Sequence, residues 1–189
     1  MKAILFDRNI NDPIPNPVGL TLISDSAITI AGRPVFLPDF DSQWSAEFYL
    51  ALKVCRLGKC ISEKFAHRYY DRFTVAMRLV PVNITAELRS QGLPTAIGDI
   101  FDNALTLGSW IELSDIAESF NITANEDSVS INNLKQMADE AIATVSRYTT
   151  LKTGDVIMIG RTSNTIVVDR GQQITTNLDG KECFALKIH

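Results

Sequence analysis

Cysteine and histidine are scarce in this sequence, which contains three cysteines and two histidines among 189 residues. Three cysteines cannot all pair with one another, which argues against a disulfide scaffold. Cys55 and Cys60 are separated by four residues, and His67 and His189 do not complete the ligand spacing of a zinc site. We therefore expect free thiols that are buried, as unpaired cysteines usually are.

Long apolar runs and an excess of positive charge are also missing. No segment approaches the roughly 20 apolar residues of a membrane-spanning helix, and the apolar run within residues 1–7 is too short for a signal peptide. The net charge is −4 and the lysines and arginines are scattered, which is not the pattern of a nucleic-acid-binding protein. We expect a cytoplasmic protein that binds neither nucleic acid nor membrane.

The composition that is present is that of an ordinary globular protein, with 46% hydrophobic and 21% charged residues. A chain of this length can bury a substantial core, and no shift in composition divides it. We therefore predict a single domain over residues 1–189.

Residues 44–59 are the most informative stretch of the chain. Residues 47–54 are apolar and β-favouring and residues 56–59 supply a turn, which predicts a mostly buried strand that runs into a loop.

Apolar residues with helical spacing predict helices over 63–73, 83–89 and 134–148, residues 97–106 are expected to form a loop, and residues 114–133 give no clear pattern. Glycine and proline signals predict a hairpin over 27–38, and the remaining strands are predicted at 2–6, 74–82, 107–113, 155–159, 165–168, 173–177 and 183–188. Strands and separate helices without regular alternation predict an α+β fold with antiparallel or mixed sheets.

Two charged residues interrupt the predicted strands. Glu47 lies in a buried strand, and Tyr49 shares its face because side chains at i and i+2 leave a strand on the same side. Arg78 lies in the apolar run 74–82, where a buried guanidinium needs a partner or a function. These three residues are the first candidates for a functional site.

The ordered motifs of the chain resemble the fumarylacetoacetate hydrolase family, in particular its short single-domain members. The most specific match is residues 151–160, which fit the family pattern Leu-x-x-Gly-Asp-x-Ile-x-x-Gly. The other matches, in chain order, are Arg8-Asn9, residues 32–38, Glu47-Phe48-Tyr49-Leu50, residues 61–73, Gly92-Leu93-Pro94, Phe101-Asp102 and Leu107-Gly108. The resemblance implies a mixed β-sandwich roll with peripheral helices, like the family's C-terminal domain, and commonly a dimer.

The chemistry of that family requires a divalent cation, usually magnesium or manganese, that chelates an enolisable 2-oxo acid. Its ligands are two carboxylates on one strand face and an aspartate on a neighbouring strand. The resemblance assigns Glu47 to the first ligand position, Tyr49 to the second and Arg78 to the third, so that Glu47 is the only retained ligand. An ion pair between Arg78 and Glu47 would place a tethered cation in the metal site.

Other positions of the family pocket also differ. The family's catalytic histidine and glutamate have no counterpart in residues 10–17, its Lys-x-x-Asp becomes Asp99 before Asp102, and its Gly-Thr-Pro becomes residues 160–162. The positions assigned to the family pocket, besides Glu47, are Arg8, Asn9, Tyr49, Arg78, Asp99, Asp102, Arg161 and Thr162.

Three functions are compatible with these replacements. The first is a non-catalytic relative with a degenerate metal site, a pseudoenzyme without a cofactor that forms homodimers. It would bind a partner protein, or a small anionic metabolite through Arg8, Arg78 and Arg161. The second is a hydrolase, decarboxylase or isomerase that acts on a 2-oxo acid through an enolate and retains Mg²⁺ or Mn²⁺. The third is a metal-free enzyme that uses Tyr49, Asp99 or Asp102 as acid or base. We predict the first, with an internal Arg78–Glu47 ion pair and no ligand as an open alternative.

Overall fold

The structure is a computed structural model that describes residues 1–162 and 165–189. Its larger sheet contains, in spatial order, β2 (Leu20–Ile23), β1 (Ala3–Phe6), β10 (Val156–Arg161), β4 (Trp44–Val54), β5 (Tyr70–Pro81), β6 (Leu105–Leu107) and β3 (Ile28–Ile30). Two short strands extend it, β11 (Ile166–Val168) on β4 and β7 (Ile111–Glu112) on β5. The smaller sheet has the order β13 (Lys181–Lys187), β12 (Gln173–Leu178), β8 (Ser119–Ala124) and β9 (Asp127–Asn132).

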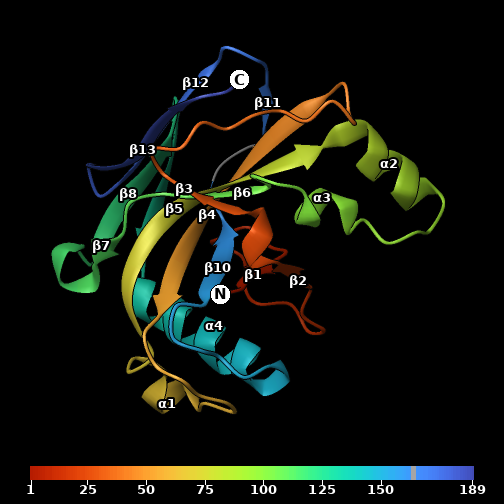
Figure 1. Ribbon diagram of the computed structural model, residues 1–189. Helices are drawn as coiled ribbons and strands as arrows, with labels where there is room; N and C mark the ends of the chain where they lie inside the picture. The colour runs from red at the N-terminus through yellow and green to blue at the C-terminus, as the bar shows by residue number, and fades with distance from the viewer. Residues whose placement is uncertain (163–164) are drawn as a thin grey trace.

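The larger sheet is mixed, because β1 pairs parallel with β10 and β3 parallel with β6, whereas its other ladders are antiparallel. It curls, and the smaller sheet packs on one side of it (Figure 1). The helices are few and peripheral: α1 (Glu63–Ala66), α2 (Val82–Ser90), α3 (Ile97–Ile100) and α4 (Leu134–Tyr148), with 3₁₀ turns η1 (Asp25–Ala27) and η2 (Leu113–Asp115). The prediction of an α+β roll with mixed sheets is confirmed.

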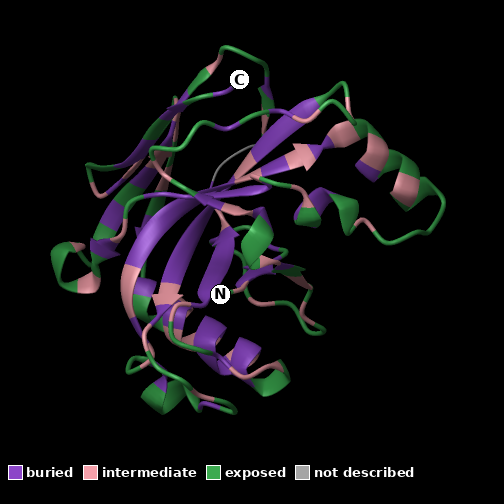
Figure 2. Ribbon diagram, viewed as in Figure 1, coloured by how far each residue is buried: buried purple, intermediate pink, exposed green. Residues whose placement is uncertain are grey.

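The long antiparallel pair β4–β5 is the centre of the fold, with Cα partners that run from Trp44 opposite Pro81 to Val54 opposite Tyr70. Alternate side chains of β4 enter two separate cores. Phe48 and Leu50 face the larger core, which contains α4 and the smaller sheet, whereas Tyr49 and Ala51 face a smaller core on the other side. Figure 2 shows that buried residues run along the central strands. On this strand the Tyr49 side chain is buried and that of Glu47 is mostly buried.

Helix α4 occupies the predicted range of residues 134–148. Its buried positions Ala138, Ala141, Ile142 and Val145 follow the apolar period and pack in the larger core. The periodic pattern predicts this helix correctly because its apolar face packs into the larger core.

The helix predicted over residues 63–73 is wrong beyond its first turn. Only Glu63–Ala66 is helical, and Tyr70 already belongs to β5. Tyr70 and Phe73 pair with Val54 and Leu52 of β4 and stack edge to face with a ring separation of 5.5 Å. Aromatic residues favour strands, and pairing along the whole of β4 outweighs the local helical spacing.

The predicted hairpin over residues 27–38 is also wrong. β3 pairs with β6 rather than with residues 34–38, and from that segment Val35 forms a single bridge to Ile188. The expected loop at 97–106 contains the short helix α3, and the undecided segment 114–133 forms the hairpin β8–β9 with Asn125 at φ +53° in its turn. These pairings join residues far apart in sequence, so local patterns do not reveal them.

The cysteine and membrane predictions have different outcomes. All three cysteines are free, but only Cys183 is buried, while Cys55 is half-buried and Cys60 is exposed. The prediction of buried thiols is therefore wrong for two of them. Among the described helices, none has the length and apolar character needed to cross a membrane.

The specific motif at residues 151–160 has a structural role at its Gly-Asp pair. Gly154 adopts φ +90°, which is a conformation that favours glycine, and Asp155 is buried behind it. The Asp155 carboxylate accepts hydrogen bonds from the backbone N–H of Lys2 at 3.1 Å and of Lys152 at 2.8 Å, and it forms an ion pair with the Lys2 side chain. Asp155 thereby joins the start of β1 to the turn before β10.

Replacing Asp155 with alanine is expected to lower the free energy of unfolding by about 1–3 kcal/mol, because the N–H groups of Lys2 and Lys152 lose their acceptor in partly buried hydrogen bonds. Urea denaturation measures this loss. Asp127→Ala is the matched control, since Asp127 makes no side-chain hydrogen bond or ion pair among the described residues, and an equal loss in both variants would contradict the assigned role.

Candidate functional site

Three neighbouring strands and one short helix bring five polar side chains together. Glu47 and Tyr49 leave β4 on the same face, and Arg78 of β5 is the direct cross-strand partner of Glu47. Arg161 at the end of β10 is the partner of Tyr49, and Asp99 comes from α3, which packs against β5. We call these five residues the Glu47 cluster.

The Glu47 cluster is a connected network of ion pairs. The Glu47 carboxylate lies 2.9 Å from Nη1 of Arg78 through Oε2 and 3.0 Å from Nη1 of Arg161 through Oε1. Arg78 also binds Asp99, with Nη2 and Nε at 2.7 and 2.9 Å from Oδ1. The phenol of Tyr49 donates a hydrogen bond to Oε2 of Glu47 at 2.9 Å. Two carboxylates therefore face two guanidinium groups, and the formal charges cancel.

The network is mostly buried, with side-chain exposures of 13% for Glu47, 15% for Arg78 and 28% for Arg161. Burial, together with the nearby Glu47 charge, raises the pKa of the Tyr49 phenol far above its ordinary value. Tyr49 is therefore a hydrogen-bond donor and not a base. Burial alone would lower the pKa of Arg78, but the carboxylates of Asp99 and Glu47 outweigh this and raise it, so that Arg78 stays charged.

Asp99 differs from the other members because burial raises its pKa and the Arg78 guanidinium offsets only part of that effect. Only its Oδ1 atom is bound by a donor among the described residues. An aspartate that is less acidic than usual and has a free oxygen is suited to accept a proton.

Replacing Tyr49 with phenylalanine is expected to lower the free energy of unfolding by about 1.5 kcal/mol, because one hydrogen bond to a charged carboxylate is lost while the ring remains packed. Chemical denaturation measures it, with the exposed Tyr148→Phe as control. A loss of more than twice this size would mean that the phenol does more than donate this one hydrogen bond.

Arg8 does not join the cluster, contrary to the sequence prediction. Its Nε donates to the carbonyl of Ile159 at 3.0 Å, its Nη1 contacts the carbonyl of Asp12, and its guanidinium lies 5.8 Å from the centre of the Phe6 ring. Phe6 belongs to the larger core, whereas Tyr49 faces the smaller one. The predicted pocket of three arginines is therefore wrong, because the Arg8 side chain takes the opposite side of the sheet.

Three other predicted positions also lie outside the cluster. The amide of Asn9 donates to the Asp12 carboxylate at 2.9 Å, and Asp102 is exposed. Thr162 is buried with its hydroxyl 3.3 Å from the carbonyl of Phe48, which is a packing role. The contact that sequence reasoning missed is Arg78 with Asp99, since α3 was expected to be loop.

The Glu47 cluster does not fit a divalent cation. Both oxygens of Glu47 are occupied by donors, and Arg78 places its fixed positive charge between the two carboxylates. Tyr49 and Arg78, which the resemblance assigns to the other two ligand positions, provide a neutral phenol and a cation instead of carboxylates. Magnesium and manganese prefer carboxylate oxygens, and a like charge beside them is repelled. Elsewhere in the described chain, no group of three or more histidine, cysteine, aspartate or glutamate residues is arranged to hold a metal.

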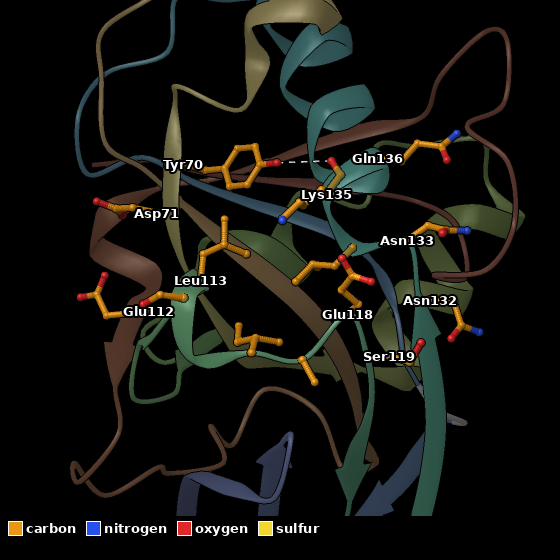
Figure 3. Close-up of a pocket in the computed structure, with 14 residues that line it drawn as sticks. Tyr70, Asp71, Glu112, Leu113, Glu118, Ser119, Asn132, Asn133, Lys135 and Gln136 are labelled. Atoms are coloured by element: carbon orange, nitrogen blue, oxygen red, sulfur yellow. Dashed lines mark hydrogen bonds between the residues drawn. The ribbon is translucent and has the colours of Figure 1, made fainter.

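A hollow with a volume of about 830 Å³, drawn in Figure 3, is bordered by none of the residues of the Glu47 cluster. It is bordered by Tyr70 and Asp71 of β5, the segment 112–119, and residues 132–136 at the start of α4. Figure 3 shows Asp71 and Glu112 on one side and Asn132, Asn133 and Gln136 on the other. None of the sequence-predicted site residues borders this hollow.

Comparison with known proteins identifies relatives along nearly the whole chain. The family described as "Fumarylacetoacetate (FAA) hydrolase C-terminal" matches residues 8–187. A mitochondrial oxaloacetate tautomerase of Caenorhabditis elegans is 23% identical over 197 residues, which covers 95% of this chain and 91% of the relative. An oxaloacetate tautomerase of Escherichia coli (strain K12) is 19% identical over 181 residues and covers 92% of this chain and 83% of the relative.

Solved structures share the fold. One of them is the fumarylpyruvate hydrolase of Pseudomonas aeruginosa in complex with Mn²⁺ and pyruvate, which superposes with a TM-score of 0.83 at 18% sequence identity. The superposition covers 100% of this chain and 89% of the hydrolase chain. The 5-carboxymethyl-2-hydroxymuconate delta-isomerase of Mycobacterium smegmatis has a TM-score of 0.78 at 18% identity, with coverage of 99% and 78%. A divalent metal is thus bound in one protein of this fold.

These names correct the functional prediction. The relatives are tautomerases, hydrolases and isomerases, and all of these are catalysts. The prediction of a non-catalytic pseudoenzyme is therefore wrong, and the alternative of an isomerase or hydrolase fits the relatives better. The inference failed because it treated the loss of metal ligands as the loss of catalysis.

Proposed function

Because the chain belongs to the fumarylacetoacetate hydrolase family, we propose that it is an isomerase that interconverts the keto and enol forms of a small 2-oxo acid. One observation carries the proposal. The relatives that match 82–96% of the chain all have the name oxaloacetate tautomerase. Oxaloacetate, a small dianion, is therefore the first substrate to test.

The proposed reaction has two chemical requirements. One proton moves between C3 and the oxygen on C2, so the site must stabilise negative charge on that oxygen and must accept or supply the proton. The guanidinium groups of Arg78 and Arg161 are fixed positive charges in a mostly buried setting, where they act more strongly on an enolate oxygen than they would in water.

Asp99 is the proposed proton carrier, which takes the proton from the enol oxygen and returns it to C3. Its pKa is raised by burial, which moves it toward the working range of a general base, and Arg78 holds its carboxylate beside the guanidinium that would face the enolate. The base must be deprotonated, so the rate is expected to rise with pH through the pKa of Asp99. That rise lies at a higher pH than for an ordinary aspartate.

Tautomerisation is a better match than carbon–carbon hydrolysis. Hydrolysis needs an activated water, which the family resemblance assigns to a histidine and a glutamate after the first strand. Residues 10–17 contain neither residue type. A tautomerase needs only the proton transfer and the charge stabilisation described above.

The chain's compartment stays a prediction, since some relatives are named as mitochondrial. Its dimeric state stays a prediction as well.

The test is the decay of the ultraviolet absorbance of freshly dissolved enol-oxaloacetate, with and without the purified protein. We expect the protein to accelerate the decay in proportion to its concentration. No acceleration over a protein-free control, with folded protein verified by circular dichroism, contradicts the proposed function.

Replacing Asp99 with asparagine is expected to reduce this rate by about a hundredfold or more, because the amide still accepts from Arg78 but cannot take a proton. Asp127→Asn, on the smaller sheet, is the control and should retain the full rate. If Asp99→Asn keeps the wild-type rate, another group is the base.

A further inference from the structure

We infer that the Glu47 cluster binds the adjacent carboxylate and 2-oxo oxygens of its ligand directly, through the guanidinium groups of Arg78 and Arg161, without a divalent cation. The identity of the acid rests on the proposed function, whereas the metal-free binding rests on the geometry of this cluster alone. The site thus differs from the metal chelate that the family resemblance implies.

The charges of the Glu47 cluster already balance without a metal ion. Glu47 and Asp99 carry two negative charges, and Arg78 and Arg161 compensate them at distances of 2.7–3.0 Å. A divalent cation beside Glu47 would have to displace two guanidinium donors from its oxygens and lie next to the charge of Arg78. The network of this chain therefore already contains the positive charge that a metal would supply.

Arg161 supplies one set of free donors. A guanidinium has five N–H bonds, and within the described parts of the chain Arg161 uses Nη1 on Glu47 while its Nε is buried without a hydrogen-bond partner. The buried Nε is closed to a ligand, whereas Nη2 has no acceptor among the described residues and can donate to one. Arg161 is 28% exposed, so part of its side chain is accessible from solvent.

Arg78 supplies the second set of donors. Its Nη1 and Nη2 atoms lie against Glu47 and Asp99, and each terminal nitrogen has two N–H bonds, so one bond on each is left over. The Arg78 side chain is 15% exposed, and the Arg161 guanidinium lies close to it, because both arginines bind the same Glu47 carboxylate. Two guanidinium groups with spare donors thus converge on one place.

The chemical class of the ligand follows from the donor geometry. Planar guanidinium groups match pairs of oxygens in one plane, as in a 2-oxo carboxylate or its enolate. Oxalate has the same two adjacent oxygens and cannot react, so it is a suitable probe. Acetate lacks the second oxygen pair and is expected to bind more weakly.

The experiment is isothermal titration of oxalate into protein that has been treated with a chelator and dialysed into metal-free buffer. We expect binding with one oxalate per chain, and the same affinity after MnCl₂ is added to excess. Arg161→Gln is expected to weaken oxalate binding about tenfold or more, because charge-assisted hydrogen bonds are lost. Arg33→Gln, which removes an exposed arginine whose side chain makes no hydrogen bond or ion pair with the cluster among the described residues, should bind as the wild type does.

Arg161→Gln leaves Arg78 paired with both carboxylates, so it should fold, and a thermal melt checks this. Binding of oxalate only after Mn²⁺ is added overturns the inference, as does no binding under either condition. Equal binding by Arg161→Gln and wild type also overturns it. Metal-free binding of oxalate without tautomerase activity would refute the proposed function and leave this inference standing, so the two failures are distinguishable.

Discussion

Arg78→Ala is expected to lower the free energy of unfolding by about 3–5 kcal/mol, because it leaves Asp99 and Glu47 as buried carboxylates with a lost partner. Asp99 is the more affected of the two, since among the described residues Arg78 is its only side-chain partner. Urea denaturation at neutral pH measures the loss. The variant is also expected to lose tautomerase activity.

Arg78→Lys separates charge from geometry. Lysine keeps the positive charge, but its single ammonium group cannot bind two carboxylates in the forked arrangement of the guanidinium. We expect an intermediate loss of stability and a loss of oxalate binding close to that of the alanine variant.

Arg72→Ala, at the other end of β5, is the matched control because its partner Glu112 is half exposed and the pair is worth little. A loss in Arg78→Ala no larger than in Arg72→Ala contradicts the structural role of Arg78.

The second large effect is expected from the double variant Tyr49→Glu with Arg78→Asp. Together with Glu47 it places three carboxylates where the family resemblance puts the metal ligands, and it removes the cation between them. We expect this variant to gain stoichiometric Mn²⁺ binding that the wild type lacks. At a hundredfold excess of metal over its dissociation constant, that binding stabilises the folded protein by about 2.7 kcal/mol, which a thermal melt detects as a rise in midpoint.

The control is Tyr49→Gln with Arg78→Asn, which has side chains of the same sizes but no new charge. Mn²⁺ should leave its melting midpoint unchanged. Stabilisation of the wild type by Mn²⁺ to the same degree as the carboxylate variant contradicts the claim that Arg78 and Tyr49 exclude the metal.

The sequence predicts the elements that rest on local patterns. Helix α4 matches its predicted range because its apolar period is regular over fifteen residues, and β4 matches because its residues are β-favouring. The beginning of β5 and the pairing of β3 with β6 depend on contacts with distant strands. The spacing of Tyr69 and Phe73 fits a helix and a strand equally well. Pairing with β4 is what makes Phe73 part of a strand.

The candidate site was predictable where two residues face each other across paired strands. The family resemblance assigns Glu47 and Arg78 to two positions of one metal site, and the structure contains the ion pair that this suggests. The contact of Arg78 with Asp99 was not predictable, because it depends on the short helix α3. Arg8 was assigned wrongly because the motif fixes its place in the chain but not the face on which its side chain leaves the backbone.

The functional prediction failed for a chemical reason. A metal ion in an enolising site supplies positive charge, and arginine supplies positive charge as well. The replacement of a ligand by Arg78 is therefore informative about the cofactor and not about catalysis. Relatives that match nearly the whole chain at about one-fifth identity are named as tautomerases, which fits the catalytic alternative better than the non-catalytic prediction.

The most direct test of the account is the rate of enol-oxaloacetate ketonisation by chelator-treated protein, compared with the same protein after MnCl₂ is added. The protein-free rate under each condition is subtracted, because free metal ions act on oxaloacetate themselves. The account predicts an enzyme-dependent rate without metal that Mn²⁺ does not increase. A rate that is absent after chelation and appears only with Mn²⁺ contradicts it, and would mean that a metal, rather than Arg78 and Arg161, stabilises the enolate.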